Sequence, residues 1–187
     1  MGGAIVRGRM GMAVLALLAG MARPAAAVDT FAVEYGAGDD DAQRFGLAFT
    51  WDWNRKWFAD GAWYLGGYWE VGGSYWDADP GRTGTDSLGE GGAAAVFRLQ
   101  PHNPIGAFMP FVEAGLGMHV FSETELQDKD FDINFSFAEH IGAGVRFGDA
   151  SQWELGYRYQ HLSNASIGDS NPGINYHLIR LAFRFGQ

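Results

Sequence analysis

The sequence predicts an all-β protein, an eight-stranded antiparallel transmembrane β-barrel, and three observations support this class. Apolar and polar residues alternate over runs of about nine to thirteen residues, which is the length that a tilted membrane strand needs. Aromatic residues make up 15% of the 187 residues and glycine accounts for 28 of them, a composition typical of membrane barrels. After Ala27 no stretch approaches the run of roughly 18 apolar residues that a transmembrane helix needs. We therefore expect the chain to cross a membrane with strands.

The amino-terminal segment has the pattern of a secretory signal peptide. Two arginines near the start precede a short apolar stretch at 10–21, and Pro24–Ala27 supplies small residues for cleavage. The apolar stretch is too short to span a membrane as a helix. We therefore expect residues 1–27 to be a cleaved signal peptide and residues 28–187 to form the outer-membrane β-barrel.

Charge and cysteine content exclude two classes of protein. Removing a leader that carries three arginines and no acidic residue changes the formal net charge from −9 to −12. Such an acidic chain is not suited to bind nucleic acid. The sequence contains no cysteine, which excludes a small secreted scaffold held together by disulfides.

Eight alternating runs, separated by clusters of turn-forming residues, are expected to form the strands. The second run is the clearest, because Phe45, Leu47 and Phe49 alternate there with small and polar residues. Acidic loops are expected at Gly38–Asp41 and Glu123–Asp132. The expected strands are Thr30–Tyr35, Arg44–Trp53, Ala62–Tyr75, Leu88–Leu99, Met109–Phe121, Phe135–Phe147, Trp153–Ser163 and Tyr176–Phe185.

The distribution of charged residues bears on which face of the sheet is inside. Arg, Glu and His share parity with glycine and alanine, as expected for the lumen of a narrow barrel. A soluble lipocalin-like barrel would place its apolar face inside, and parity alone leaves both arrangements open. The leader, the aromatic strand ends and the charged small-residue face favour the membrane barrel. The lumen would then hold Glu70, Glu113, His119 and His140, which we interpret as a polar core and not a metal site, because no ligand spacing recurs.

The seventh run places two reactive side chains on an apolar face. Odd-numbered residues of this strand include Tyr157, Tyr159, His161 and Ser163, and successive odd residues point to the same side. If the amino terminus is periplasmic, this end of the strand is the outer one, level with the outer leaflet. A histidine and a serine on a lipid-facing surface suit a substrate that arrives through the lipid.

The residues around this pair resemble those of a known family. His161-Leu-Ser-Asn-Ala165, the following Asn171-Pro-Gly173 and the closing strand are similar to the outer-membrane lipid A 3-O-deacylases, the acyloxyacyl hydrolase-like family. The resemblance is specific over about residues 161–185. It implies an esterase of the Gram-negative outer membrane that removes the acyl chain at position 3 of lipid A, without a cofactor or metal. His161 would be the base and Ser163 the nucleophile, while Asn164 would contribute to the oxyanion pocket with support from Asn171.

One position departs from the pattern that the resemblance implies. The family has a glutamate fourteen residues after the histidine, and this chain has Asn175 there. Asparagine can orient a histidine by hydrogen bonding but offers no negative charge to stabilise the imidazolium. Two functions therefore remain open: a lipid A esterase, and a noncatalytic structural or adhesive barrel that retains a degenerate motif. The sequence also leaves open whether the barrel is a homodimer.

Strand pairing suggests a replacement acid. The turn before the seventh strand centres near Ala150, so residues whose numbers add up to about 300 should face each other across the two strands. Glu139 is then the partner of His161, and its parity also directs it outward. We expect Glu139 to pair with His161 and complete an acid–base–nucleophile set. The alternative is that its carboxylate extends to the membrane interface.

Overall fold

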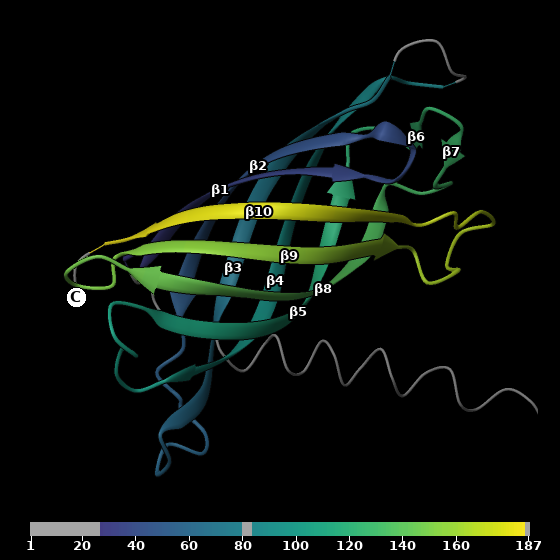
Figure 1. The fold of residues 1–187 in the computed structure, drawn as a ribbon. Coiled ribbons are helices and arrows are strands. Elements are labelled where there is room, and N and C mark those ends of the chain that lie inside the picture. Colours follow the sequence, from purple (N-terminus) through teal and green to yellow (C-terminus); the bar gives the residue numbers. More distant parts are fainter. Residues whose placement is uncertain (1–26, 80–83, 186–187) are drawn as a thin grey trace, which may run out of the picture.

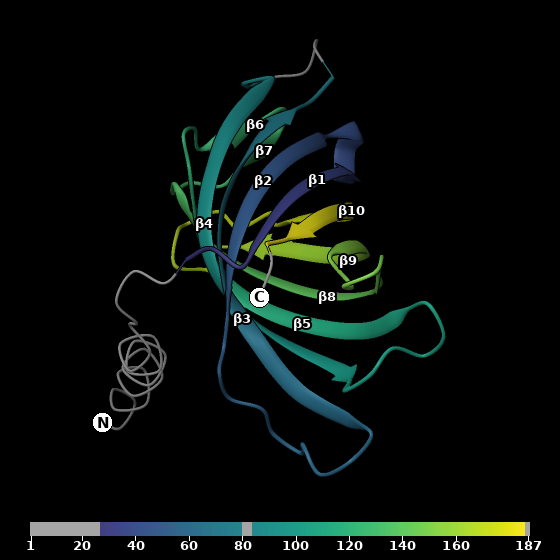
Figure 2. The ribbon, with the colours of Figure 1, turned by 90° about the vertical axis from the view of Figure 1, so that its left-hand side faces the viewer.

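The computed structural model describes residues 27–79 and 84–185 (Figure 1). Within these ranges, eight long antiparallel strands close into a barrel in the order β1-β10-β9-β8-β5-β4-β3-β2, and Figure 2 shows them following one another round the wall. The elements are β1 (Thr30–Gly38), the 3-10 helix η1 (Asp39–Asp41), β2 (Gln43–Asp52), β3 (Trp63–Asp77), β4 (Ser87–Pro101), β5 (Met109–Phe121), β6 (Glu125–Leu126), β7 (Lys129–Asp130), β8 (Phe135–Phe147), β9 (Trp153–Ser163) and β10 (Ile174–Arg184). The predicted fold class is confirmed. The predicted leader falls almost wholly outside the described residues and stays a prediction.

The strand boundaries match the predictions for β5, β8 and β9 and differ elsewhere. β1 continues from its predicted end at Tyr35 to Gly38, through small residues that carry no alternation signal. β10 begins at Ile174, two residues before its predicted start, because Ile174 and Asn175 pair with the end of β9. The predicted acidic loop at 123–132 contains the short hairpin β6–β7.

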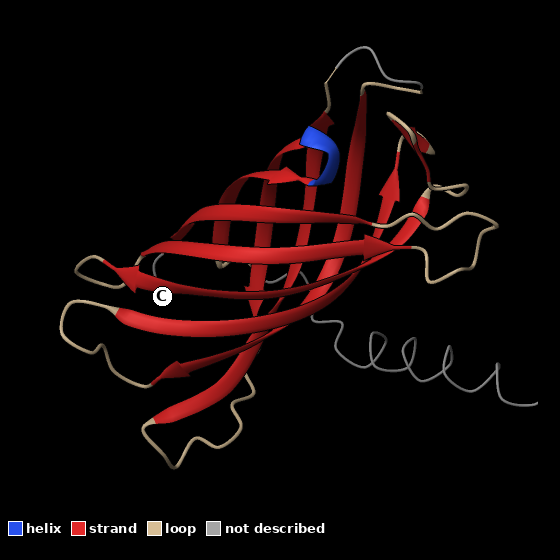
Figure 3. Ribbon diagram, turned by 45° about the vertical axis from the view of Figure 1, so that its right-hand side comes forward, coloured by secondary structure: helices blue, strands red, loops and turns tan. Residues whose placement is uncertain are grey.

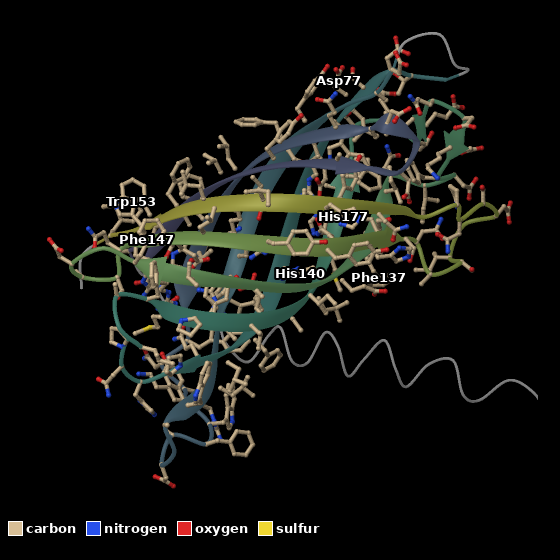
Figure 4. All side chains as sticks on the ribbon, in the orientation of Figure 1. Asp77, Phe137, His140, Phe147, Trp153 and His177 are labelled. Carbon is tan, nitrogen blue, oxygen red and sulfur yellow. The ribbon has the colours of Figure 1, made fainter. Side chains whose placement is uncertain are left out.

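The barrel has a charged lumen and an apolar outer face. The side chain of Ile141 points outward and is 65% exposed, whereas Arg180 points inward and is 2% exposed. Figure 4 shows side chains projecting from the outer surface along the whole wall. This arrangement is that of a membrane barrel and not of a soluble lipocalin-like one, in which the apolar face would line the interior.

A network of ion pairs fills the middle of the lumen. Arg158 Nη1 lies 2.8 Å from Glu70 Oε1, and Arg158 Nε lies 2.8 Å from Glu113 Oε1. Arg98 Nη1 lies 2.6 Å from Glu154 Oε2. Because each buried charge has partners of opposite sign, the lumen is a polar core that fixes the wall from inside. The network comprises Glu34, Glu70, Arg98, Glu113, Glu154, Arg158 and Arg180.

The two predicted lumen histidines also lie inside. His119 contacts Glu90, and His140 Nε2 lies 3.9 Å from Glu113 Oε1. Across the described part of the chain, no group of three or more His, Cys, Asp or Glu side chains is arranged to hold a metal ion.

One end of the barrel carries four connections, among them the longest one at 122–134, and apolar side chains close the lumen there. The connections after β1, β3, β5 and β9 gather at this end, which we call the loop end, whereas the turns at 53–62, 102–108 and 148–152 lie at the opposite end (Figures 1 and 3). In the described ranges no helix is long and apolar enough to cross a membrane. The buried apolar cluster, here called the plug, includes Trp76, Leu88, Phe121, Leu126, Phe131, Leu162, Ile174 and Tyr176.

Candidate active site

His161 and Ser163 lie on the outer face of β9 at the loop end. Both are half-buried, while Leu162 between them is fully buried in the plug. Ser163 is the last residue of β9 and pairs with Phe137 of β8, which Figure 4 labels at the loop end of that strand. Both residues share the odd parity of Tyr157 and Tyr159, whose side chains are exposed on the same strand.

Three polar residues stand side by side across the wall at the level of His161. Its backbone partner on β8 is Glu139, and its partner on β10 is Asn175. The register predicted from the turn near Ala150 is thus confirmed. Because neighbouring strands lie about 4.8 Å apart, both flanking side chains start close to the imidazole.

Asn175 forms the hydrogen bond that orients the imidazole. Its Oδ1 lies 2.8 Å from His161 Nδ1. An amide oxygen only accepts hydrogen bonds, so Nδ1 carries the hydrogen in this pair and Nε2 keeps a free lone pair. A histidine in this tautomer can accept a proton at Nε2, which is the state that a general base requires.

Glu139 does not make the side-chain contact that the sequence predicted. Its side chain is exposed, and it forms no hydrogen bond or ion pair with any described residue. The Nδ1 of His161 is already bound by Asn175 on the opposite side, and a carboxylate near the end of a membrane strand can extend to the interface. The expected pairing is therefore a backbone pairing only.

Asn164 faces the lumen and not the lipid. Its side chain is 1% exposed, and its Nδ2 donates to Phe131 O at 3.0 Å and to Ser170 O at 2.7 Å. Both amide hydrogens are thus used, and the backbone N–H of Asn164 donates to Asn171 Oδ1 at 2.9 Å. In this conformation Asn164 anchors the loop to the plug and has no hydrogen left for an oxyanion. Its even number, shared with the inward residues of β9, is a sequence signal for this orientation.

The chain turns sharply directly after Ser163. Ala165 and Ser166 both adopt left-handed backbone conformations, with φ of 54° and 59°. The turn is closed by Ser166 N donating to Asn164 Oδ1 at 2.9 Å and by Ile167 N donating to Asn164 O at 3.1 Å. It leaves Ile167 64% exposed.

The returning half of this loop brings two further residues to the site. Asn171 accepts from Asn164 N through Oδ1, so its Nδ2 points away from that bond and has no hydrogen-bond partner among the described residues. Gly173, at φ 62°, packs against the imidazole: a Cβ there would lie 3.0 Å from His161 Cε1 and 3.6 Å from His161 Nε2. The Asn-Pro-Gly sequence thus supplies an unused donor and a close backbone approach.

Comparisons with known proteins identify relatives of this chain. A family model described as lipid A 3-O-deacylase (PagL) matches residues 43–184. Lipid A deacylase PagL of Pseudomonas aeruginosa is 31% identical over 163 residues, which cover 87% of this chain and 90% of that protein. Lipid A deacylase PagL of Bordetella bronchiseptica is 33% identical over 112 residues, 60% of this chain and 58% of that protein.

A solved structure gives the same result at the level of the fold. The crystal structure of the outer membrane enzyme PagL aligns with a TM-score of 0.75 at 27% identity, covering 83% of this chain and 99% of that one. The outer membrane setting of that enzyme matches the apolar outer face and charged lumen found here. This chain belongs to the lipid A 3-O-deacylase (PagL) family.

Proposed function

We propose that this outer-membrane barrel hydrolyses the ester-linked acyl chain at position 3 of lipid A, with Ser163 as nucleophile and His161 as base. The observation that carries the proposal is the His161 Nδ1–Asn175 Oδ1 hydrogen bond of 2.8 Å. It holds the imidazole in the tautomer that can take a proton from the serine two residues further along the same outer face. Membership of the family supports the substrate and the reaction.

The reaction proceeds in two steps. His161 Nε2 takes the proton of Ser163 Oγ as the oxygen attacks the acyl carbonyl, and the tetrahedral intermediate collapses with release of the lipid A hydroxyl, which receives that proton. The acyl chain is then an ester of Ser163. A water molecule, deprotonated by His161, attacks this ester, and the fatty acid leaves as Ser163 regains its proton.

We assign stabilisation of the oxyanion to the loop between β9 and β10. A tetrahedral intermediate needs hydrogen-bond donors that are not already committed. The Nδ2 of Asn171 is such a donor, whereas both Nδ2 hydrogens of Asn164 are used. The role of Asn164 in this proposal is to hold the loop that presents Asn171.

The substrate reaches the site within the plane of the membrane. Exposed apolar side chains line the outer wall on the strands next to β9, among them Ile141 opposite Tyr159 and Ile179 opposite Tyr157, and they would contact acyl chains. We propose that the loop end faces outward, which places the site at the depth of the outer leaflet, where lipid A lies. The ester would then meet the serine without leaving the bilayer.

The test is mass spectrometry of lipid A from a Gram-negative host that expresses the full chain, Ser163→Ala or Ser166→Ala. Ser166 is the matched control, because it lies three residues after Ser163 and its side chain forms no hydrogen bond with a described residue. We expect one acyl chain to be lost with the wild type and with Ser166→Ala, and retained with Ser163→Ala. Unchanged lipid A in all three strains, with the barrel shown to be folded, would favour a noncatalytic structural or adhesive barrel.

A further inference from the structure

The carboxylate of Asp39 lies next to the site although it is far away in sequence. Asp39 is the first residue of η1, directly after β1, and β1 pairs with β10 so that Gly38 faces Tyr176. One residue further on, Asp39 therefore comes beside Asn175. Figure 3 shows η1 as the helical turn at the loop end of the barrel.

Two hydrogen bonds connect Asp39 to Asn175. Asp39 Oδ2 accepts from the backbone N of Asn175 at 3.0 Å and from Asn175 Nδ2 at 2.7 Å. An ionised carboxylate only accepts hydrogen bonds, so the amide must turn its NH₂ toward Asp39. The amide oxygen of Asn175 is thereby left facing His161 Nδ1.

We propose that Asp39 is a positioning residue of the esterase, which supplies through Asn175 the negative charge that Asn175 itself lacks. The sequence of contacts runs from Asp39 Oδ2 to Asn175 Nδ2, and from Asn175 Oδ1 to His161 Nδ1. The inference rests on the proposed function, because the arrangement has a catalytic purpose only if His161 acts as base. No proton moves along this sequence; Asp39 and Asn175 orient and polarise.

The physical basis is cooperative hydrogen bonding. A carboxylate that accepts from one end of an amide polarises it and increases the negative charge on the amide oxygen. That oxygen then holds the Nδ1–H of His161 more strongly when the imidazole becomes positively charged. A carboxylate bonded directly to His161 would do the same at shorter range. Here Asn175 stands between the Asp39 carboxylate and the His161 imidazole.

The fold holds Asp39 in this place through a close approach of backbones. A Cβ at Gly38 would lie 2.6 Å from the Tyr176 ring and 2.8 Å from Asn175 O, so only glycine allows β1 to end so near β10. Gly38 N donates to Ala42 O at 2.7 Å, which closes the η1 turn, and Ala42 is buried in the plug. The carboxylate is exposed, but the backbone that carries it is fixed.

The experiment compares activity of purified full-length protein in mixed micelles of detergent and lipid A. Asp41→Asn is the matched control, because it removes the same charge from the same turn, and asparagine tolerates the φ of 60° found there. We expect Asp39→Ala to lower kcat by roughly tenfold with little change in KM, as for an exposed hydrogen bond to a charged group. Asp41→Asn should stay within about twofold of the wild type. Equal losses in the two variants would refute the specific role of Asp39.

A second background separates positioning from loop structure. In the Asn175→Glu variant the orienting residue carries its own charge, and Asp39 would repel it. Asp39→Asn should therefore lower activity in the wild-type background but leave it unchanged or raise it in the Asn175→Glu background. A purely structural role predicts the same loss in both backgrounds, and that result would overturn the proposal.

A measurement that needs no activity keeps this inference separate from the proposed function. Nitrogen-15 NMR of histidine-labelled protein in micelles, with His161→Gln to assign the signal, distinguishes the Nδ1–H and Nε2–H tautomers. We expect Nδ1–H in the wild type and in Asp41→Asn, and a shift toward Nε2–H in Asp39→Ala. An unchanged tautomer in Asp39→Ala would overturn the positioning role whether or not the protein is active. Failure of the proposed function would appear instead as equal activity of the wild type and Ser163→Ala.

Discussion

The two asparagines of the loop after β9 have opposite hydrogen-bond assignments, and an isosteric substitution at each one tests them. Asn171→Asp keeps the oxygen that accepts from Asn164 N at 2.9 Å and removes the unused NH₂. Asn164→Asp keeps the oxygen that accepts from Ser166 N and removes the two donors to Phe131 O and Ser170 O. The first change is therefore expected to affect catalysis and the second to affect stability.

The magnitudes follow from the number of bonds lost. Removing one oxyanion donor costs about 2.7–4 kcal/mol of transition-state stabilisation, so Asn171→Asp should lower kcat by about 10²–10³. The free energy of unfolding should change little, because the loop bond is retained. Asn164→Asp leaves two carbonyl oxygens without donors and places a carboxylate beside them. At about 1–3 kcal/mol for each unpaired buried acceptor, with Ser170 O partly reached by water, the free energy of unfolding should fall by about 2–4 kcal/mol.

Two assays on the same samples separate these effects. Acyl-chain release from lipid A in micelles gives kcat and KM, and urea unfolding in micelles, followed by tryptophan fluorescence, gives the free energy of unfolding. Trp76, one of seven tryptophans in the chain, lies in the plug with Phe131, so the fluorescence includes a signal from the region that Asn164 anchors. The assignment is wrong if Asn171→Asp retains activity within about threefold while Asn164→Asp loses activity and keeps full stability. That pattern would make Asn164 the donor.

Three further substitutions test the ion-pair network of the lumen and the residues around the proposed site. Arg158→Met leaves buried glutamates short of a partner and should lower the free energy of unfolding by about 3–5 kcal/mol; an unchanged urea midpoint would contradict the role of the network. Gly173→Ala places a Cβ 3.0 Å from His161 Cε1 at a φ of 62°, so the imidazole should be displaced and kcat should fall. Unchanged kinetics would show that the imidazole can accommodate the added methyl group. Tyr157→Phe removes the exposed 2.6 Å contact with His177, and acyl-chain release should stay within about twofold; a larger loss would extend the site along the wall.

Side-chain alternation and the positions of the turns were enough to predict most of the strands that form the barrel wall. Alternation identified which face of each clear strand is apolar, because each strand has one face in the lumen and one in lipid. The centre of the turn near Ala150 was enough to predict the pairing of Glu139 with His161. It could not predict that the two side chains stay apart, because the choice between Glu139 and Asn175 as partner depends on contacts with a third strand.

Other features were missed because their signals lie outside local alternation. The hairpin β6–β7 consists of two pairs of residues in a polar segment, too short for a strand pattern to appear. The even number of Asn164 indicates its inward orientation, whereas the resemblance to the family motif implied a role for Asn164 in the oxyanion pocket. Nothing local indicates that Asp39 contacts Asn175, since 136 residues separate them.

The departure from the family pattern at Asn175 lies beside the seam where the barrel closes. β10 is the last strand and pairs with β1, the first, so a site on the last strands can be completed by a residue near the start of the chain. The segment matched by the family model begins at residue 43, after Asp39 and η1. Residues 161–175 alone therefore do not include the carboxylate that contacts Asn175. The Asn175 amide is oriented by the Asp39 carboxylate across the junction of β1 and β10. This contact favours a functional His161 base over a motif that has lost its activity.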